Sequence, residues 1–231
     1  MMKTIGLLGG MSWESTATYY REINEGIKKN LGGLHSAKIL LYSVDFAEIE
    51  KLQHLDRWPE MAVILGDAAK RLQNGGADFV LICTNTMHKV APEIEANLHI
   101  PLLHIADATA DEIKDKGIFR VGLLGTRFTM EEDFYKGRLE DVHGIDVLVP
   151  GAVDREIVHR AIYDELCQGV ISPASRSEFV RIINMLYKQG AEAVILGCTE
   201  IALLVQQEHT TVPLFDTTKI HAEKAVETAV Q

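Results

Sequence analysis

The chain lacks the features that would place it outside a reduced, aqueous compartment. It has three cysteines among 231 residues, at positions 83, 167 and 198, with no C-x-x-C motif. No stretch approaches the roughly 18 apolar residues of a membrane-spanning helix. The apolar run after Lys3 breaks off at Gly9-Gly10, too early for a signal peptide. These absences predict a cytoplasmic protein with free thiols and no membrane partner.

Basic residues and metal-binding clusters are also scarce. Lysine and arginine number 23 against 33 aspartates and glutamates, which gives a formal net charge of −10. Because nucleic-acid binders neutralise phosphates with lysine and arginine, this balance argues against nucleic-acid binding. His99, His104 and Asp107 lie close in sequence but span a predicted strand and its exit, so we expect no metal site there.

The sequence does contain a repeat of its own first half. Residues 3–10 return as 120–126, residues 76–85 as 190–199, and residues 100–103 as 212–215. Each half is close to the usual size of a domain. We therefore expect a first lobe of residues 1–108 plus 210–231 and a second lobe of residues 109–209.

Short runs of leucine and β-branched residues alternate with longer amphipathic segments. Strands are predicted over residues 4–8, 38–44, 78–83, 101–105, 120–124, 146–149, 192–197 and 213–215. Helices are predicted after Ser12, from Pro59 to Gly75, from a capping box at Thr129, and over residues 154–168, 175–189 and 218–230. This order predicts an α/β fold with two mostly parallel sheets, each flanked by helices.

Ligands of such sheets bind at the carboxyl ends of the strands. The loops in that position are residues 9–12, 83–88, 125–129 and 197–200, and they include the best-matched parts of the repeat. We expect two loops from each lobe to enclose a small cleft between the lobes.

Three motifs in these loops resemble the aspartate/glutamate racemase family. They are Gly9-Gly10-Met11-Ser12-Trp13-Glu14-Ser15-Thr16, Cys83-Thr84-Asn85-Thr86-Met87-His88 and Gly197-Cys198-Thr199-Glu200. With Val44-Asp45-Phe46 and Ile49-Glu50, the detailed form is similar to bacterial racemases that prefer L-aspartate or L-glutamate. The resemblance covers essentially the whole chain. It implies an amino-acid racemase without pyridoxal phosphate, other cofactor or metal, built as two pseudo-symmetric lobes and forming a homodimer.

Racemisation removes the α-proton from one face of the substrate and returns a proton to the other, so it needs two acid/base groups. The repeat aligns Cys198 with Thr84, where family members have a second cysteine. A one-residue shift would instead bring Cys83 to this position, since such a slip sends a strand side chain to the opposite face. We favour Thr84, or a water that it holds, opposite Cys198, with Cys83 as a small buried strand residue. A thiol has a pKa of roughly 8.5, which a nearby helix amino terminus can lower, and its conjugate base can take the proton.

Substrate binding is expected to rely on neutral groups. Some aspartate racemases carry an arginine near the end of the second strand and a lysine that corresponds here to Cys167. Neither cation is evident in this chain, so the natural substrate could be a different amino acid. Glu200 could bind the substrate amino group or tune the thiol, and His88 could hydrogen-bond near the site or simply pack. The expected substrate-binding residues are Met11, Gln53, Asn85, Thr86, Thr126, Thr199 and Glu200.

Two other functions stay open at this point. One is a maleate isomerase or decarboxylase-like activity that uses Cys198 as nucleophile or proton donor. The other is a catalytically weak protein that binds amino acids in the same cleft.

Overall fold

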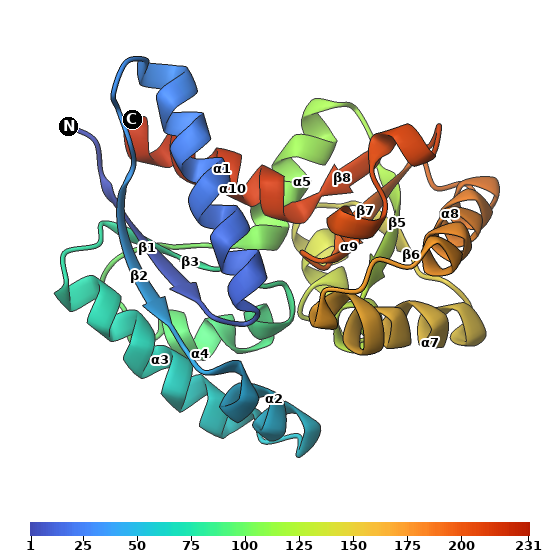
Figure 1. The fold of residues 1–231 in the computed structure, drawn as a ribbon, viewed down its shortest axis with the longest axis horizontal. Coiled ribbons are helices and arrows are strands. Elements are labelled where there is room, and N and C mark those ends of the chain that lie inside the picture. The colour runs from blue at the N-terminus through green and yellow to red at the C-terminus, as the bar shows by residue number, and fades with distance from the viewer. The chain divides into compact units, whose positions relative to one another are not determined.

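The computed structural model describes residues 1–231 and divides into two compact units. Unit 1 contains residues 1–105 and 221–231, and unit 2 contains residues 106–220. Each unit holds a four-stranded sheet flanked by helices (Figure 1). None of the helices is both long enough and apolar enough to span a membrane.

The elements follow one another in a regular alternation of strand and helix. Unit 1 contains β1 (Thr4–Gly9), α1 (Trp13–Leu31), β2 (Lys38–Ser43), α2 (Phe46–His54), α3 (Trp58–Asn74), β3 (Phe79–Ile82), η1 (Thr86–Val90), α4 (Ala91–Glu95) and β4 (Leu102–Leu103). At the boundary, α5 (Ile105–Asp115) leads into unit 2. Unit 2 continues with β5 (Arg120–Gly125), α6 (Arg127–Glu131), η2 (Arg138–Val142), β6 (Asp146–Leu148), α7 (Ala152–Arg160), η3 (Ala161–Glu165), η4 (Leu166–Gln168), α8 (Pro173–Lys188), β7 (Ala193–Gly197), α9 (Ile201–Leu204), η5 (Gln207–His209) and β8 (Leu214–Asp216). The last helix, α10 (Thr217–Val230), belongs to unit 1 from His221 onward.

The two sheets have the same topology and the same register. Their strand orders are β2-β1-β3-β4 and β6-β5-β7-β8, and all the pairings are parallel. Val80 of β3 pairs with Gly6, and Val194 of β7 pairs with Gly122, the counterpart of Gly6 in the repeat. Thr84 and Cys198 each lie four residues further along. The strand register therefore makes these two residues equivalent in their respective sheets.

In unit 1, the sheet is covered on both faces. Ile5, Leu7 and Leu81 of the strands form one cluster with side chains of α1 and α10, including Tyr19 and Val226. Helix α3 packs against β1, β2 and β3 and lies on the opposite face from α1 (Figure 1). Burial on both faces explains why the strands read as nearly continuous apolar runs.

In unit 2, the main cluster joins β5 and β7 to helices α7 and α8, which lie between β6 and β7 in sequence. Leu124, Val194 and Leu196 pack with Phe179 and Ile183 of α8, and α7 adds further apolar side chains. Gly122 is required here because a Cβ atom would lie 2.9 Å from Leu186 Cδ1 of α8. The glycine lets this helix pack closely on the sheet.

The predicted fold class and all eight predicted strands are confirmed, but three details differ. The helix predicted to start at Thr129 begins at Arg127, because Thr126 accepts the Thr129 N–H and is the true N-cap. Residues 210–220 lie in unit 2 rather than in the first lobe, since β8 pairs with β7. Helices α2 and α5 were not predicted.

Candidate active site

Cys198 directly follows β7 and lies beside a buried carboxylate. It is 8% exposed, and its thiol donates a hydrogen bond to Glu200 Oε2 at 3.0 Å. The Thr199 hydroxyl donates to the same oxygen at 2.6 Å. Glu200 is itself buried, at the N-cap of α9. The thiol therefore has a carboxylate proton acceptor within direct reach.

This environment makes the Cys198 thiol less acidic. Burial raises the pKa of Cys198 well above its ordinary value, and the charge of Glu200 raises it further. A helix amino terminus can lower the pKa of a thiol, but burial and Glu200 outweigh that effect at Cys198. Helix α9 has only four residues, so its dipole is small compared with the effect of a buried neighbouring carboxylate. At neutral pH, the resting residue is a thiol rather than a thiolate.

Thr84 and Cys83 have different environments at the end of β3. Cys83 is fully buried in the α1 and α10 cluster, and burial raises the pKa of its thiol. The Cys83 N–H donates to Leu8 O at 2.9 Å, so this residue still follows the sheet. Thr84 comes next and is half-buried. Successive side chains of an extended chain point to opposite sides, which accounts for the difference between the two residues.

Four further predicted residues of unit 1 lie near the carboxyl ends of its strands. Met11 follows β1, Gln53 lies on α2 after β2, and Asn85 and Thr86 follow Thr84; all four are buried. The loop that carries Met11 depends on Gly10, which has φ +94° and whose hypothetical Cβ would lie 2.3 Å from Val44 O. The carboxyl ends of parallel strands meet at one edge of a sheet, so these residues share that edge.

Unit 2 has a matching arrangement at the ends of β5 and β7. Gly125 and Gly197 pair across these strands, and Thr126 and Cys198 directly follow them. A Cβ on Gly197 would lie 2.9 Å from Leu124 O, so the two chains approach closely here. This pairing brings Thr126 to the same sheet edge as Cys198, Thr199 and Glu200.

Some aspartate racemases carry an arginine near the end of the second strand and a lysine at the position of Cys167. Neither region has a basic side chain at the corresponding position of this chain. Asp45 caps α2 by accepting the Ala47 N–H at 3.1 Å. Cys167 is half-buried and packs against the apolar cluster that contains Cys198. Position 167 therefore packs against the same apolar cluster as Cys198.

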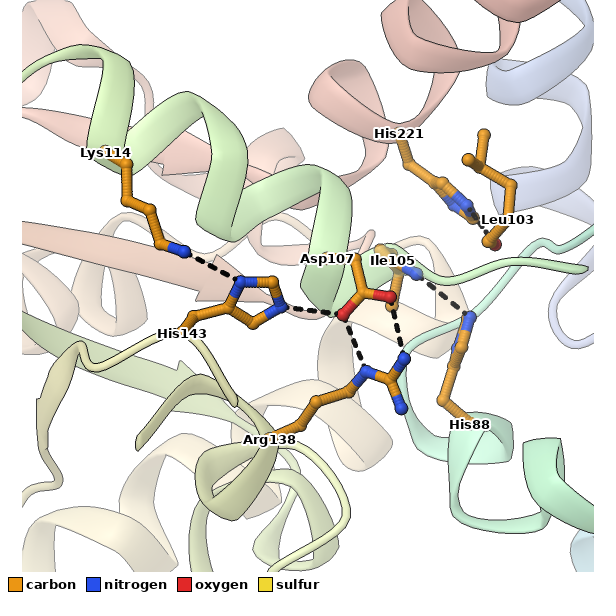
Figure 2. Close-up of polar contacts among 8 residues, drawn as sticks. All are labelled: His88, Leu103, Ile105, Asp107, Lys114, Arg138, His143 and His221. Atoms are coloured by element: carbon orange, nitrogen blue, oxygen red, sulfur yellow. Dashed lines mark hydrogen bonds and ion pairs between the residues drawn. The ribbon is translucent and has the colours of Figure 1, made fainter. Parts of the chain in front are cut away.

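His88 holds the loop that carries Thr84, a role that sequence reasoning left open. Its Nδ1 lies 2.8 Å from Thr84 O. Its Nε2 accepts the Ile105 N–H at 3.2 Å (Figure 2). The signal available in the sequence was the spacing of four residues between Thr84 and His88, which permits a bond from a side chain back to the carbonyl. Its other partner, Ile105, lies 17 residues away in sequence. A contact at that separation cannot be predicted from local residue spacing.

The histidines and Asp107 that were weighed as a metal site have other partners. Asp107 accepts two hydrogen bonds from Arg138, at 2.6 and 2.7 Å, and a third from His143 at 2.8 Å (Figure 2). His104 instead packs against the His88 ring. No set of three or more histidine, cysteine, aspartate or glutamate side chains in the chain is arranged to hold a metal ion.

Known proteins match this architecture over its whole length. The family model described as Asp/Glu/Hydantoin racemase matches residues 8–225. The chain belongs to this family. The enzyme is therefore an isomerase, as the loop motifs predicted. The match includes the last two residues of β1, the other seven strands and every loop described above.

Individual relatives extend the comparison. The enzyme is 57% identical to an Asp/Glu racemase candidate of known structure from Yersinia pestis, with each chain fully covered and a TM-score of 0.94. It is 35% identical to an aspartate racemase homologue from Pyrococcus horikoshii, again with full coverage of both, at a TM-score of 0.85. It is 23% identical to the broad-specificity amino-acid racemase RacX of Bacillus subtilis, with 97% of each chain covered.

Proposed function

We propose that the enzyme interconverts L- and D-amino acids without a cofactor, with L-aspartate and L-glutamate as preferred substrates. Cys198 removes the α-proton of the L isomer, and Thr84, or a water held by it, serves the other face of the α-carbon. The observation that carries this proposal is the matched strand register, which assigns Thr84 and Cys198 to equivalent positions of two duplicated sheets. A duplicated fold is well suited to a reaction that treats two faces of one carbon alike.

The proton path in unit 2 starts from the hydrogen bond between Cys198 and Glu200. The thiol passes its proton to the Glu200 carboxylate, 3.0 Å away. The resulting thiolate takes the α-proton, and the electron pair of the broken C–H bond stays on the substrate as a carbanion. Glu200 returns its proton to solvent. Because the pKa of Cys198 is raised by burial and by Glu200, the thiolate is a stronger base once formed, although less of it is present at neutral pH.

Thr84 sets the limit on net turnover. A hydroxyl is a very poor base at neutral pH, so it acts best by donating a proton or by holding a water that does. The enantiomers have equal free energy in solution, so kcat/KM must be equal in the two directions. A weak group on one face therefore slows net racemisation both ways, while exchange of the L α-proton with solvent stays fast.

Substrate recognition is assigned to neutral donors at the two sheet edges. Backbone N–H groups at strand-to-helix turns bind carboxylates and stabilise developing negative charge. Hydroxyl and amide side chains add to these: Gln53, Asn85, Thr86, Thr126 and Thr199. Glu200 carries a negative charge beside the thiol, which suits the substrate ammonium group. We assign a role in shaping the substrate pocket to Met11.

The preference for acidic substrates rests on similarity to Asp/Glu racemases, whereas one observation favours a second candidate. Position 167 is a cysteine that packs against the cluster containing Cys198, and no lysine stands there to pair with a distal carboxylate. RacX is described as having broad specificity. Neutral amino acids are therefore the second candidate class of substrates.

The test is to incubate wild-type enzyme and a Cys198→Ala variant with each L-amino acid in D2O and to follow the α-proton by NMR. We expect deuterium uptake into L-aspartate or L-glutamate with the wild type only. A protein that only binds amino acids would gain thermal stability from the ligand but show no exchange dependent on Cys198. The D isomers are incubated separately in the same way: fast α-deuteration of a D isomer with retained configuration, without deuteration of the L isomer, would contradict the assignment of Cys198 to the L face.

A further inference from the structure

Both ring nitrogens of His88 are engaged inside unit 1. The residue lies on η1, four residues after Thr84, and is 1% exposed. Nδ1 lies 2.8 Å from Thr84 O. Nε2 lies 3.2 Å from the Ile105 backbone nitrogen (Figure 2). The ring therefore joins the loop that carries Thr84 to the first residue of α5.

These contacts select a single protonation form of the His88 ring. A carbonyl oxygen only accepts, so Nδ1 carries the proton and donates to Thr84 O. The Ile105 N–H only donates, so Nε2 must be unprotonated. The other tautomer, or the charged imidazolium, would turn a second N–H toward the Ile105 N–H. The neutral ring with its proton on Nδ1 is therefore the form that satisfies both partners.

Neighbouring side chains fix the plane of this ring. The His104 ring packs edge-on against it with centroids 4.5 Å apart, and the His221 ring lies 5.9 Å away. His221 is itself held at both nitrogens, by Leu103 O at 2.8 Å and by the Tyr19 hydroxyl at 2.8 Å. A buried, packed ring of this kind has little freedom to rotate, so its bond to Thr84 O is directional.

In unit 2, the carbonyl equivalent to Thr84 O is that of Cys198, and its hydrogen-bond partner is a backbone group instead of a side chain. Cys198 O accepts the Ile201 backbone N–H at 3.1 Å, a bond that any residue type at position 201 except proline could make. The corresponding Thr84 O is held by an imidazole. A side chain can be replaced without altering the path of the backbone, so this contact can be tested directly.

We propose that His88 is a positioning residue that sets the orientation of Thr84 for the second proton-transfer step. This inference rests on the proposed function, because it concerns the residue assigned to the second face. His88 acts on the backbone carbonyl of Thr84 and so directs the Thr84 side chain. Misplacement of a reacting group by about 1 Å can cost roughly 100-fold in rate. His88 should therefore matter for completing racemisation, and much less for exchange at the face served by Cys198.

The experiment compares three variants at saturating substrate in D2O. His88→Ala removes both contacts. His88→Asn keeps an N–H donor near the position of Nδ1, and His88→Gln places an amide nearer the position of Nε2. Two rates are measured for each variant: deuterium uptake into the L isomer, and net conversion of L to D. Thermal unfolding confirms that each protein is folded at the assay temperature.

We expect His88→Ala to lower net conversion by about 10- to 100-fold while uptake into the L isomer stays near the wild-type rate. His88→Asn should restore much of the conversion, and His88→Gln should restore little. Equal loss of both rates in all three folded variants, or an unchanged ratio of the rates in His88→Ala, would overturn the positioning role. Absence of exchange dependent on Cys198 in the wild type would instead overturn the proposed function, and this inference with it.

Discussion

Units 1 and 2 have the same sheet topology but different residues at one equivalent position, Thr84 in unit 1 and Cys198 in unit 2. In unit 2, the residue after β7 is a thiol whose hydrogen bond goes to a buried carboxylate. In unit 1, the equivalent residue is a hydroxyl whose own carbonyl is held by a buried imidazole. The strand pairings are parallel in both and follow the same order, and Val80 pairs with Gly6 as Val194 pairs with Gly122. The two units therefore share one strand register, while the residue type at the equivalent position differs.

The buried cysteine of unit 1 sharpens this contrast. Cys83 lies one residue before Thr84, inside the α1 and α10 cluster, where burial raises its pKa. Unit 2 has Gly197 at the equivalent position, and a Cβ there would lie 2.9 Å from Leu124 O. The thiol of unit 1 therefore occupies a core position that has no side chain in unit 2.

The largest effect is expected from removing the thiol of unit 2. Cys198→Ala should lower deuterium uptake into the L isomer by about 10³-fold, because no other group is assigned to abstract that proton. The measurement is α-proton loss by NMR, with Cys167→Ala as the control cysteine variant. Equal activity of Cys198→Ala and the wild type would remove the basis for assigning unit 2 to the L face.

The next effect comes from making the two units chemically alike. Thr84→Cys should raise net racemisation by about 10-fold or more, since a thiol is a far better proton-transfer group than a hydroxyl at neutral pH. Polarimetry or chiral chromatography measures the conversion from either enantiomer. No gain, or a loss, would point to Cys83 as the second acid/base group.

A cation near the Cys198 cluster should change substrate preference. Cys167→Lys should raise kcat/KM for L-aspartate relative to L-alanine by about 10-fold, in line with the energy of a charge-assisted hydrogen bond. Cys167→Met is the uncharged control of similar length. An equal change for both substrates in the lysine variant would show that position 167 does not face the distal carboxylate.

Glu200 should control how readily the thiol ionises. Glu200→Gln removes the negative charge that raises the pKa of Cys198, so alkylation of Cys198 by iodoacetamide should begin at lower pH. Racemisation should fall in the same variant, because the carboxylate that accepts the thiol proton is gone. An unchanged alkylation profile would mean that burial alone sets the acidity of the thiol.

The smallest effect concerns stability. Cys83→Ser places a hydroxyl in the apolar cluster of unit 1 and should lower the free energy of unfolding by about 1–3 kcal/mol. The ratio of L-isomer exchange to net conversion should remain that of the wild type. Denaturant unfolding gives the first quantity, and the D2O assay gives the second. A changed ratio would show that Cys83 takes part in proton transfer.

The repeat explains why so much of the fold could be predicted. Glycine-ended apolar runs specify buried parallel strands, and their matched spacing gave both sheets and the equivalence of Thr84 and Cys198. Helix α2 was missed because Phe46–His54 is short and its signal is weak next to β2. The start of α6 was misplaced because Thr126 and Thr129 both fit a capping role, and only the hydrogen bond to Thr126 Oγ1 separates them.

The candidate site was predicted less completely. Local motifs pointed to Cys198, Thr84 and Glu200, since residue type and loop position were enough. The raised pKa of the Cys198 thiol was out of reach of the sequence, because burial depends on the whole cluster around Cys198. The hydrogen bond from His88 to Thr84 O could not be predicted from the sequence either, because the position of the His88 ring depends on Ile105 and on the packing of His104 and His221.

The two units are matched in geometry, and we propose that they are unequal in proton transfer. One NMR time course in D2O with the preferred L substrate can measure both the rate of α-deuteration of the L isomer and the rate of D-isomer formation. We expect deuterated L isomer to accumulate well before D isomer appears. Appearance of D isomer as fast as L-isomer deuteration would contradict this proposal, because the two faces would then be served equally well.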